Sequence, residues 1–135
     1  MEQTLIIVKP DAVARGLIGE VIRRFEARGL RITKLSLLDA PRETVESHYD
    51  EHREKPFFGD VVAYLTSGPI VVMAVEGPNA VGACRAMMGA TNPSEAAPGT
   101  IRGDLAVSLE ENVVHGSADP ESAHRELAIW FPLNQ

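Results

Sequence analysis

Short apolar runs and amphipathic stretches alternate along the chain. The apolar runs at residues 4–8 and 70–75 predict buried strands, and the alternating pattern of residues 31–38 predicts a strand with one solvated face. A fourth strand is expected to contain residues 113–115. Between these runs apolar residues recur at helical spacing, which predicts five helices. The first carries Ile18 to Phe25, the second starts at Pro41, the third carries Phe58 to Leu65, the fourth runs from Pro78 to a stop at Gly89, and the fifth starts at Pro120.

The predicted elements follow the order β-α-β-(αα)-β-α-loop-β-α. This order matches two split βαβ units and predicts an α+β fold, a ferredoxin-like split βαβ sandwich with a four-stranded antiparallel sheet and helices packed on it. Residues 90–103 are rich in Pro and Gly and are expected to form a long loop that contains Arg102. A structureless connection of more than about 12 residues is usually functional in a compact domain.

The last predicted helix directs a carboxylate toward the core. Asp119 is a suitable N-cap, and Pro120 is a suitable first helical residue. Three residues mark the buried face of this helix: Ala123, Leu127 and Trp130. Glu126 lies on the same stripe, and a buried carboxylate needs a donor. His115 is the candidate donor because a tight turn joins the fourth strand to this helix; a solvated helix-edge position is the alternative for Glu126.

The segment Asn112-Val-Val-His115-Gly-Ser117 carries the candidate nucleophile. Imidazole has an ordinary pKa of about 6.5, so much of it is neutral at pH 7 and one ring nitrogen is free to attack. A carboxylate that holds one ring nitrogen fixes the tautomer and leaves the other nitrogen available. The alternative for His115 is a histidine at the edge of the core, satisfied by backbone groups.

Composition and charge narrow the class of protein. The 135 residues suit one domain, residues 1–135, and the formal net charge of -6 argues against a nucleic-acid surface. The single cysteine, Cys84, falls on the buried face of a predicted helix and fits a reducing interior. The apolar runs are too short to span a membrane, and neither of the longest two follows a signal-peptide pattern. We therefore expect a cytoplasmic protein without a membrane or nucleic-acid partner.

Three cations stand beside turn residues in this acidic chain. They are Lys9, at the end of the first strand, Arg85, on a helix, and Arg102, in the long loop. Each one alone is most simply a solvated charge. Together with a nucleophilic histidine they indicate a phosphate site, because guanidinium and ammonium groups neutralise the oxygens of a transferring phosphoryl group.

Familiar phosphate and metal motifs are missing from the sequence. It contains no G-x-x-x-x-G-K-[ST] or G-x-G-x-x-G loop and no H-R-D catalytic loop. No cluster of carboxylates offers a protein cage for a divalent ion. If Mg²⁺ is the cofactor, we expect it to arrive on the phosphates of the substrate.

His48-Tyr-Asp-Glu51-His52 matches the pattern H-x-x-E-H of inverted zinc peptidases, with two histidines one helical turn apart. The pattern is short, and a zinc site needs a further protein ligand and a substrate cleft. A solvated helix face is the simpler interpretation.

Several ordered blocks of the sequence resemble the nucleoside diphosphate kinase family. The resemblance runs from Thr4 to Phe131 and rests on these blocks: Ile7-Val-Lys9-Pro-Asp11, Lys55-Pro-Phe57-Phe58, Thr66-Ser-Gly-Pro69, Met88-Gly-Ala-Thr91-Asn-Pro93, Pro98-Gly-Thr-Ile-Arg102-Gly-Asp104 and Asn112-Val-Val-His115-Gly-Ser117. It implies the ferredoxin-like fold and a ping-pong transfer of the γ-phosphate of a nucleoside triphosphate to a nucleoside diphosphate through a phosphohistidine at His115.

The resemblance also implies a role for each site residue. Lys9 and Asn112 would contact the sugar hydroxyls, with Lys9 also reaching the phosphates. Glu126 would orient the His115 ring, and Ser117 would lie within hydrogen-bonding reach of the site. The remaining residues implied to bind substrate are Tyr49, in the phosphate pocket, Phe57, stacked on the base, and Arg85, Thr91 and Arg102, on the phosphate chain. Stacking on one aromatic face tolerates any base, so the implied specificity is broad.

Two departures from the family pattern flank the site. Glu110-Glu111 stands where the family commonly has Gly-Arg, and Ala118 where it commonly has Asp. The acidic pair is the one hint of an alternative function, a nucleotide-binding regulator without turnover. The resemblance further implies a homo-oligomer, for which we favour a hexamer over a tetramer. Since the chain stops shortly after Phe131, we expect no long C-terminal arm in that assembly.

Overall fold

A central strand, β1 (Glu2–Val8), organises the sheet in the computed structural model of this protein, which describes residues 1–132. Within those residues four strands pair in the order β2-β3-β1-β4, where β2 is Arg31–Leu38, β3 is Ile70–Gly77 and β4 is Val114–Gly116. All three pairings are antiparallel. The predicted ferredoxin-like α+β architecture is therefore confirmed.

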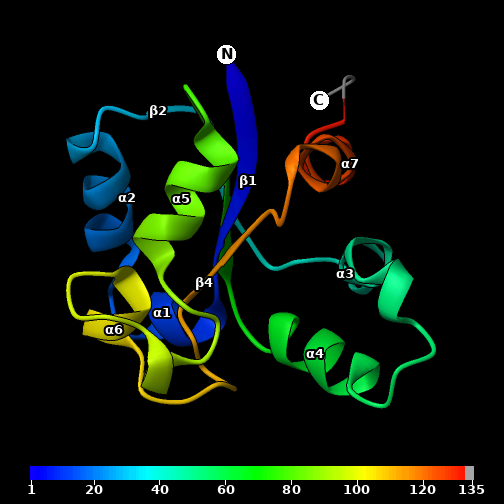
Figure 1. Ribbon diagram of the computed structural model, residues 1–135. Helices are drawn as coiled ribbons and strands as arrows, with labels where there is room; N and C mark the ends of the chain where they lie inside the picture. The colour runs from blue at the N-terminus through cyan, green and yellow to red at the C-terminus, as the bar shows by residue number, and fades with distance from the viewer. Residues whose placement is uncertain (133–135) are drawn as a thin grey trace.

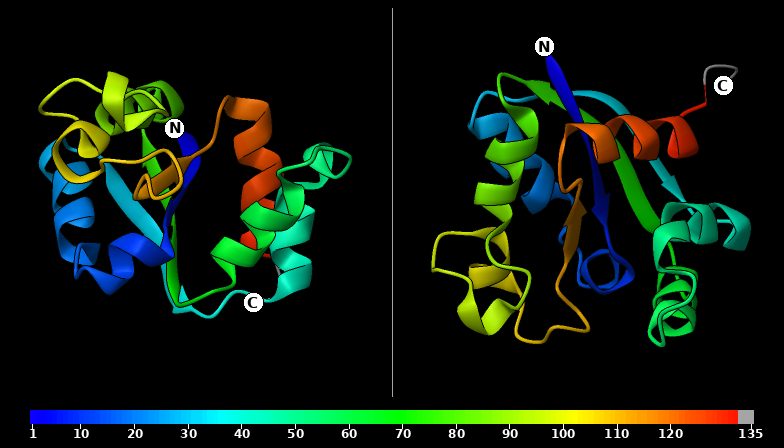
Figure 2. Two further views of the ribbon diagram at one scale, coloured as in Figure 1. Left: turned by 90° about the horizontal axis from the view of Figure 1, so that it is seen from below. Right: turned by 45° about the vertical axis from the view of Figure 1, so that its right-hand side comes forward.

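Helices cover both faces of this sheet (Figures 1 and 2). Ile6 and Val8 of β1 point into one core layer, where they join Phe25 of α2 (Ile18–Ala27) and Met88 of α5 (Ala80–Met88). Their neighbours along the strand point the other way, into a layer with α3 (Arg42–His48), α4 (Phe58–Leu65) and α7 (Pro120–Trp130). Because successive strand residues alternate faces, the continuously apolar part of β1, residues 5–8, is what a strand covered on both sides requires.

Most predicted helices lie where the pattern placed them, with small shifts at their ends. Asp119 caps α7 as expected, since its Oδ1 accepts the backbone N–H of Ser122 at 2.7 Å. The helix expected from Pro78 begins two residues later, because Asn79 adopts a left-handed conformation with φ of 52°. Val81, Cys84 and Met88 are all buried on the inner face of α5, as predicted.

The predicted long loop is wrong in part. Residues 90–103 include a short 3₁₀ helix, η2 (Pro93–Glu95), and the start of a five-residue helix, α6 (Ile101–Leu105), which carries Arg102. Thr100 caps α6 by accepting the backbone N–H of Gly103 at 3.0 Å. Another five-residue helix, α1 (Pro10–Ala14), follows β1 directly, and a 3₁₀ helix, η1 (Asp50–His52), follows α3.

The edge strand β2 presents apolar side chains to solvent. Its alternation is present as predicted, but the exposed positions include Leu35 and Leu37, whose exposed fractions are 54% and 63%. A bulge between Ile32 and Lys34 shifts its register against β3. None of the helices in residues 1–132 combines the length and the hydropathy needed to cross a bilayer.

Candidate active site

His115 lies on β4, a short strand at one edge of the described sheet, next to β1. In the pairing of β4 with β1 it stands opposite Ile7. Directly opposed residues share a face of the sheet, and Ile7 packs in the layer of α3, α4 and α7. The register therefore places the imidazole on the α7 side, where its exposed side-chain fraction of 19% keeps it within reach of solvent.

Glu126 holds one ring nitrogen of His115, as the helix pattern predicted. Nε2 of His115 lies 3.0 Å from Oε1 of Glu126, and the same oxygen accepts the hydroxyl of Ser117 at 2.8 Å. Ser117 is itself fixed, because its Oγ accepts the backbone N–H of Leu5 at 3.2 Å. Burial acts to raise the pKa of Glu126, but the hydrogen bond and charge of His115 outweigh it and hold this pKa below its usual range. The carboxylate is thus a buried anion.

A strained turn precedes the histidine. Val113 has a φ of 74°, a left-handed conformation that is a clear outlier for a β-branched residue. The N–H of Val114 donates to the carbonyl of Asn112 at 2.8 Å, which closes a three-residue γ-turn around Val113. The N–H of Val113 donates to Oδ2 of Asp11 at 3.2 Å, and Asp11 also accepts the hydroxyl of Tyr64. This turn explains why β4 begins only at Val114, one residue later than predicted.

Lys9 and Asn112 meet across this turn. Nζ of Lys9 donates to Oδ1 of Asn112 at 2.7 Å, and Nδ2 of Asn112 donates to the carbonyl of Thr91 at 3.0 Å. Burial, followed by the nearby charge of Arg102, lowers the pKa of Lys9 to about 8. The pKa of Lys9 therefore lies close to neutral pH, where the side chain is still mainly a cation.

Arg102 is buried behind the site, on α6, with an exposed fraction of 5%. Its guanidinium donates to three backbone carbonyls, those of Asn112 at 3.3 Å, Gly89 at 2.9 Å and Val114 at 2.8 Å. Burial, together with the charge of Arg85, lowers its pKa to about 10. Arg102 thus ties the strained turn to the end of α5, and two of its five N–H groups have no acceptor among residues 1–132 and remain for a ligand.

The predicted site residues converge on one cavity of about 240 Å³. Eight of them line it: Lys9, Tyr49, Arg85, Thr91, Arg102, Asn112, His115 and Glu126. Ser117 lies behind the lining, fully buried. Phe57 lies at the rim, with 44% of its surface exposed and its ring 5.5 Å from that of His52, which does line the cavity.

Residues that the sequence did not assign to this site also line the cavity: His48, Glu51, His52, Gly116, Ala118 and Ser122. Gly116 and Ala118 neighbour His115 in the sequence, and Ala118 was already noted as flanking the site. Ser122 lies on α7 and is brought in by tertiary packing, which no local signal marks. The H-x-x-E-H motif did single out His48, Glu51 and His52, but for zinc chemistry. Glu110 and Glu111 are exposed, and neither is among the described residues that line the cavity.

The zinc-peptidase interpretation of His48 and His52 is wrong. The pattern requires both histidines on one helix, but α3 ends at His48, and His52 belongs to the separate helix η1. In the described residues the group of ligand-type side chains is instead His48, His115 and Glu126. The simpler interpretation, a solvated helix face, is also wrong for His48, which is 2% exposed and whose Nδ1 accepts the indole N–H of Trp130 at 3.0 Å.

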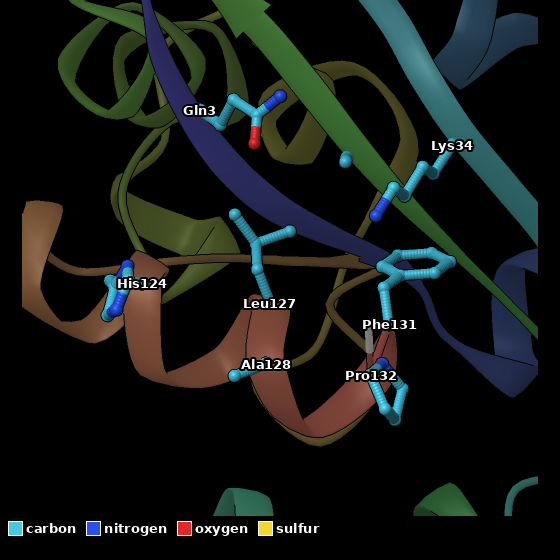
Figure 3. Close-up of a pocket in the computed structure, with 8 residues that line it drawn as sticks. Gln3, Lys34, His124, Leu127, Ala128, Phe131 and Pro132 are labelled. Carbon is cyan, nitrogen blue, oxygen red and sulfur yellow. The ribbon is translucent and has the colours of Figure 1, made fainter. Parts of the chain in front are cut away.

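A second cavity, of about 350 Å³, lies between α7 and the sheet. Figure 3 shows Leu127, Ala128 and Phe131 on one side of it and Gln3 and Lys34 on the other. The ammonium of Lys34 lies 5.6 Å from the centre of the Phe131 ring. The nucleophile and the cations of the first cavity are not part of its lining.

A ferredoxin-like sheet that presents a carboxylate-held imidazole beside a lysine and two arginines has the arrangement of a phosphotransferase. The family model described as Nucleoside diphosphate kinase matches residues 2–135, and the chain belongs to this family.

Proteins that carry this family name are similar to the chain over almost the whole length of both. The nucleoside diphosphate kinase of Rubrobacter xylanophilus is 58% identical over 131 residues, which cover 97% of this chain and 98% of that protein. The enzyme of Thermus thermophilus is 55% identical, with 97% and 96% covered. The crystal structure of a nucleoside diphosphate kinase family protein from Babesia bovis is 46% identical and has a TM-score of 0.97, covering 100% of this chain and 91% of that one.

Proposed function

We propose that this chain transfers the γ-phosphoryl group of a nucleoside triphosphate, typically ATP, reversibly to a nucleoside diphosphate through a phosphohistidine on His115. The observation that carries the proposal is the contact between His115 and Glu126. With Nε2 held at 3.0 Å, Nδ1 is the nitrogen available for attack, and within residues 1–132 it has no hydrogen-bond partner. We also propose that residues 1–135 form one catalytic domain.

In the first half-reaction, Nδ1 of His115 attacks the γ-phosphorus in line. The N–P bond forms while the bond from phosphorus to the bridging oxygen of the β-phosphate breaks, and the nucleoside diphosphate leaves with that electron pair. The proton on Nε2 stays in place, and Glu126 balances the positive charge that the ring acquires. The second half-reaction reverses these steps with another diphosphate in the same cavity.

Lys9, Arg85 and Arg102 neutralise the negative charge of the phosphates. Arg85 is exposed on α5 beside the cavity, and Arg102 reaches it from behind with its unused N–H groups. We propose that both bind the phosphate chain, with the hydroxyl of Thr91 as a further donor. Because these groups are already in place, little reorganisation is needed when charge develops on the phosphoryl oxygens.

Lys9 and Asn112 serve the sugar end of the nucleotide. They form one hydrogen-bonded pair at 2.7 Å, so they present a donor and an amide together to the sugar hydroxyls, and Lys9 also extends to the phosphates. Tyr49 closes the pocket near His115, and Phe57 at the rim offers an exposed face on which a base stacks. Ser117 acts through Glu126.

Mg²⁺ enters as part of the substrate. The cavity lining holds two carboxylates, and Glu126 already accepts two hydrogen bonds on one oxygen while Glu51 is exposed. Mg²⁺ prefers six oxygen ligands and retains waters, so a metal carried by the phosphates of the substrate would fit this lining better than one bound by the protein. Its contribution is to neutralise phosphate charge.

We further propose a homo-oligomer, a hexamer rather than a tetramer, working in the cytoplasm. The exposed leucines of the edge strand β2 support self-association, because an open strand edge with apolar side chains is a surface that proteins normally cover. The buried free thiol of Cys84 fits a reducing compartment. Native mass spectrometry of the purified protein distinguishes the two assemblies.

Intact-protein mass spectrometry before and after incubation with ATP and Mg²⁺ tests the proposed function. We expect a gain of one phosphoryl group that is labile in acid and stable in base, and its loss when a second diphosphate is added. His115→Gln should abolish the gain, whereas His124→Gln, an exposed histidine on α7, should not. Nucleotide binding without any transfer would instead favour the regulator, the function at which the Glu110-Glu111 pair hinted.

A further inference from the structure

A buried histidine lies directly behind the proposed nucleophile and has no part in the steps above. His48, the last residue of α3, is 2% exposed. Its ring packs edge-to-face against the ring of His115, with centroids 4.6 Å apart. Its Nδ1 accepts the indole N–H of Trp130, on α7, at 3.0 Å.

The indole of Trp130 fixes the tautomer of His48. An indole N–H can only donate, so the nitrogen that receives it carries no proton. The ring is neutral, because burial, followed by the charge of His115, lowers the pKa of His48 to about 3. A neutral imidazole with a bare Nδ1 has its proton on Nε2, which makes that atom a permanent donor.

Nε2 of His48 faces the far side of the carboxylate that holds His115. It lies 3.9 Å from Oε2 of Glu126, the oxygen that His115 and Ser117 leave free, since both of them engage Oε1. The carboxylate therefore has an imidazole N–H toward each of its two oxygens, one at hydrogen-bond distance and one slightly beyond it.

We infer that Trp130 and His48 are positioning residues, which keep the Glu126 carboxylate ionised and aimed so that Nδ1 of His115 faces the phosphorus. This inference rests on the proposed function. A His48 ring locked as a neutral donor has no free nitrogen to accept a proton, so it cannot remove the one on Nε2 of His115. That proton stays between His115 and Glu126 throughout both half-reactions.

A metal site is the rival interpretation of the same three side chains. One ligand-type atom from each of His48, His115 and Glu126 fits within a span of 4.8 Å. A metal on Nε2 of His48, however, would displace the proton from that nitrogen. The proton would then either move to Nδ1, toward which the indole N–H of Trp130 points, or leave the ring, which would become an anion. Two N–H groups cannot face each other at 3.0 Å, so the observed bond favours positioning.

Two substitutions of His48 separate the roles of its two nitrogens. In His48→Gln the side-chain amide nitrogen lies near the place of Nε2 and keeps a donor toward Glu126. In His48→Asn the amide oxygen lies near the place of Nδ1 and keeps only an acceptor for Trp130. We expect the kcat of His48→Asn to fall at least about tenfold below that of His48→Gln, with similar KM values for the nucleotide.

Trp130→Phe completes the series by removing the indole donor while keeping a large aromatic ring. We expect the phosphorylation rate of Trp130→Phe in a single turnover to fall severalfold. In ¹H–¹⁵N spectra the wild-type protein should show a single tautomer of His48, and Trp130→Phe should lose it. Unfolding transitions of all three variants establish that each one folds. A purely structural role would lower stability without separating Asn from Gln in kcat.

The outcomes distinguish this inference from the proposed function. If the wild-type protein never becomes phosphorylated, the proposed function is wrong. If it does, but His48→Asn matches or exceeds His48→Gln, or His48 carries its proton on Nδ1, then only the positioning role is overturned. Stoichiometric zinc bound by His48, with transfer that depends on it, would overturn it as well.

Discussion

Nε2 of His115 lies 3.0 Å from Oε1 of Glu126, which follows it by 11 residues along the chain. The pair joins a strand to the helix packed over it, and the turn between them is short enough to keep both side chains in register. One oxygen of the carboxylate serves both His115 and Ser117. The orientation of the nucleophile therefore depends on a single charged atom.

Glu126→Gln should lower the rate of His115 phosphorylation about 10- to 100-fold, because the amide keeps the shape of the side chain but not its charge. Rapid-quench measurement of a single turnover with ATP reports this step directly. Glu121→Gln, an exposed residue of the same helix, is the matched control and should react at the wild-type rate. An unchanged rate in Glu126→Gln would mean that the carboxylate does not orient the ring.

Arg102→Lys should destabilise the protein by about 2–3 kcal/mol, because the three N–H groups of an ammonium share one nitrogen and cannot reach carbonyls that three different guanidinium nitrogens bind, which leaves buried acceptors without donors. Two of these carbonyls, those of Asn112 and Val114, flank the strained Val113, so the turn loses its main tie. Urea unfolding measures the effect. Arg85→Lys is the control, since Arg85 is exposed and makes one long bond, 3.4 Å, to the carbonyl of Gly116; a similar loss in both variants would contradict the prediction.

Acid should unfold this protein partly through His48. Because the pKa of His48 is about 3 in the folded chain and about 6.5 in the unfolded chain, the unfolded state binds a proton between these values that the folded state does not. The free energy of unfolding should therefore fall as pH decreases below about 6.5, by up to about 1.4 kcal/mol per pH unit from this one group. The stability is complete above pH 6.5 and is lost toward pH 3.

His48→Gln removes that titrating group, so its unfolding free energy should depend less steeply on pH between 6.5 and 4.5 than that of the wild-type protein. Below this window the carboxylate of Glu126, whose pKa is also lowered, contributes in both proteins. Urea unfolding at a series of pH values gives both slopes. Equal slopes would show that His48 takes up its proton without unfolding the chain.

Local sequence patterns were enough to predict much of the fold and the contact between His115 and Glu126. The alternation of residues 31–38 gave β2 its observed bounds, and the Asp119-Pro120 pair marked the start of α7. The helical spacing that put Glu126 on the buried face of α7 also led to His115, because one tight turn joins their two elements. In these cases the signal lies within a few residues of the structure it describes.

Other features depend on contacts that no local pattern carries. The helices α1 and α6 have five residues each, too few to show a helical period, so Arg102 was expected in a loop. The left-handed Val113 is imposed by partners far along the chain, Asp11 among them. The bond between Trp130 and His48 joins residues 82 positions apart, and the local motif around His48 favoured a solvated helix face, with a zinc site as the rival.

The pH dependence of kcat/KM for the nucleotide should reflect the loss of charge on Lys9. With a pKa of about 8 in the free protein, lowered by burial and by Arg102, Lys9 loses its charge above that pH and binds phosphate less strongly. We expect kcat/KM to decline above about pH 8 while kcat, which reports the complex, declines less. Lys9→Arg should abolish this decline, because a guanidinium stays charged. A decline that persists unchanged in Lys9→Arg would assign it to another group.

Phe57→Ala should raise the nucleotide KM by roughly 5- to 150-fold, the range that corresponds to about 1–3 kcal/mol of base stacking. The increase should be similar for purine and pyrimidine nucleotides, because every base offers a flat face to the ring. Stability should change little, since 44% of Phe57 is exposed at the rim of the cavity. Steady-state kinetics with four nucleoside diphosphates measure this, and Phe57→Tyr, which keeps the ring, should recover most of the affinity. An increase confined to one base would show that the rim reads base identity through groups other than the ring of Phe57.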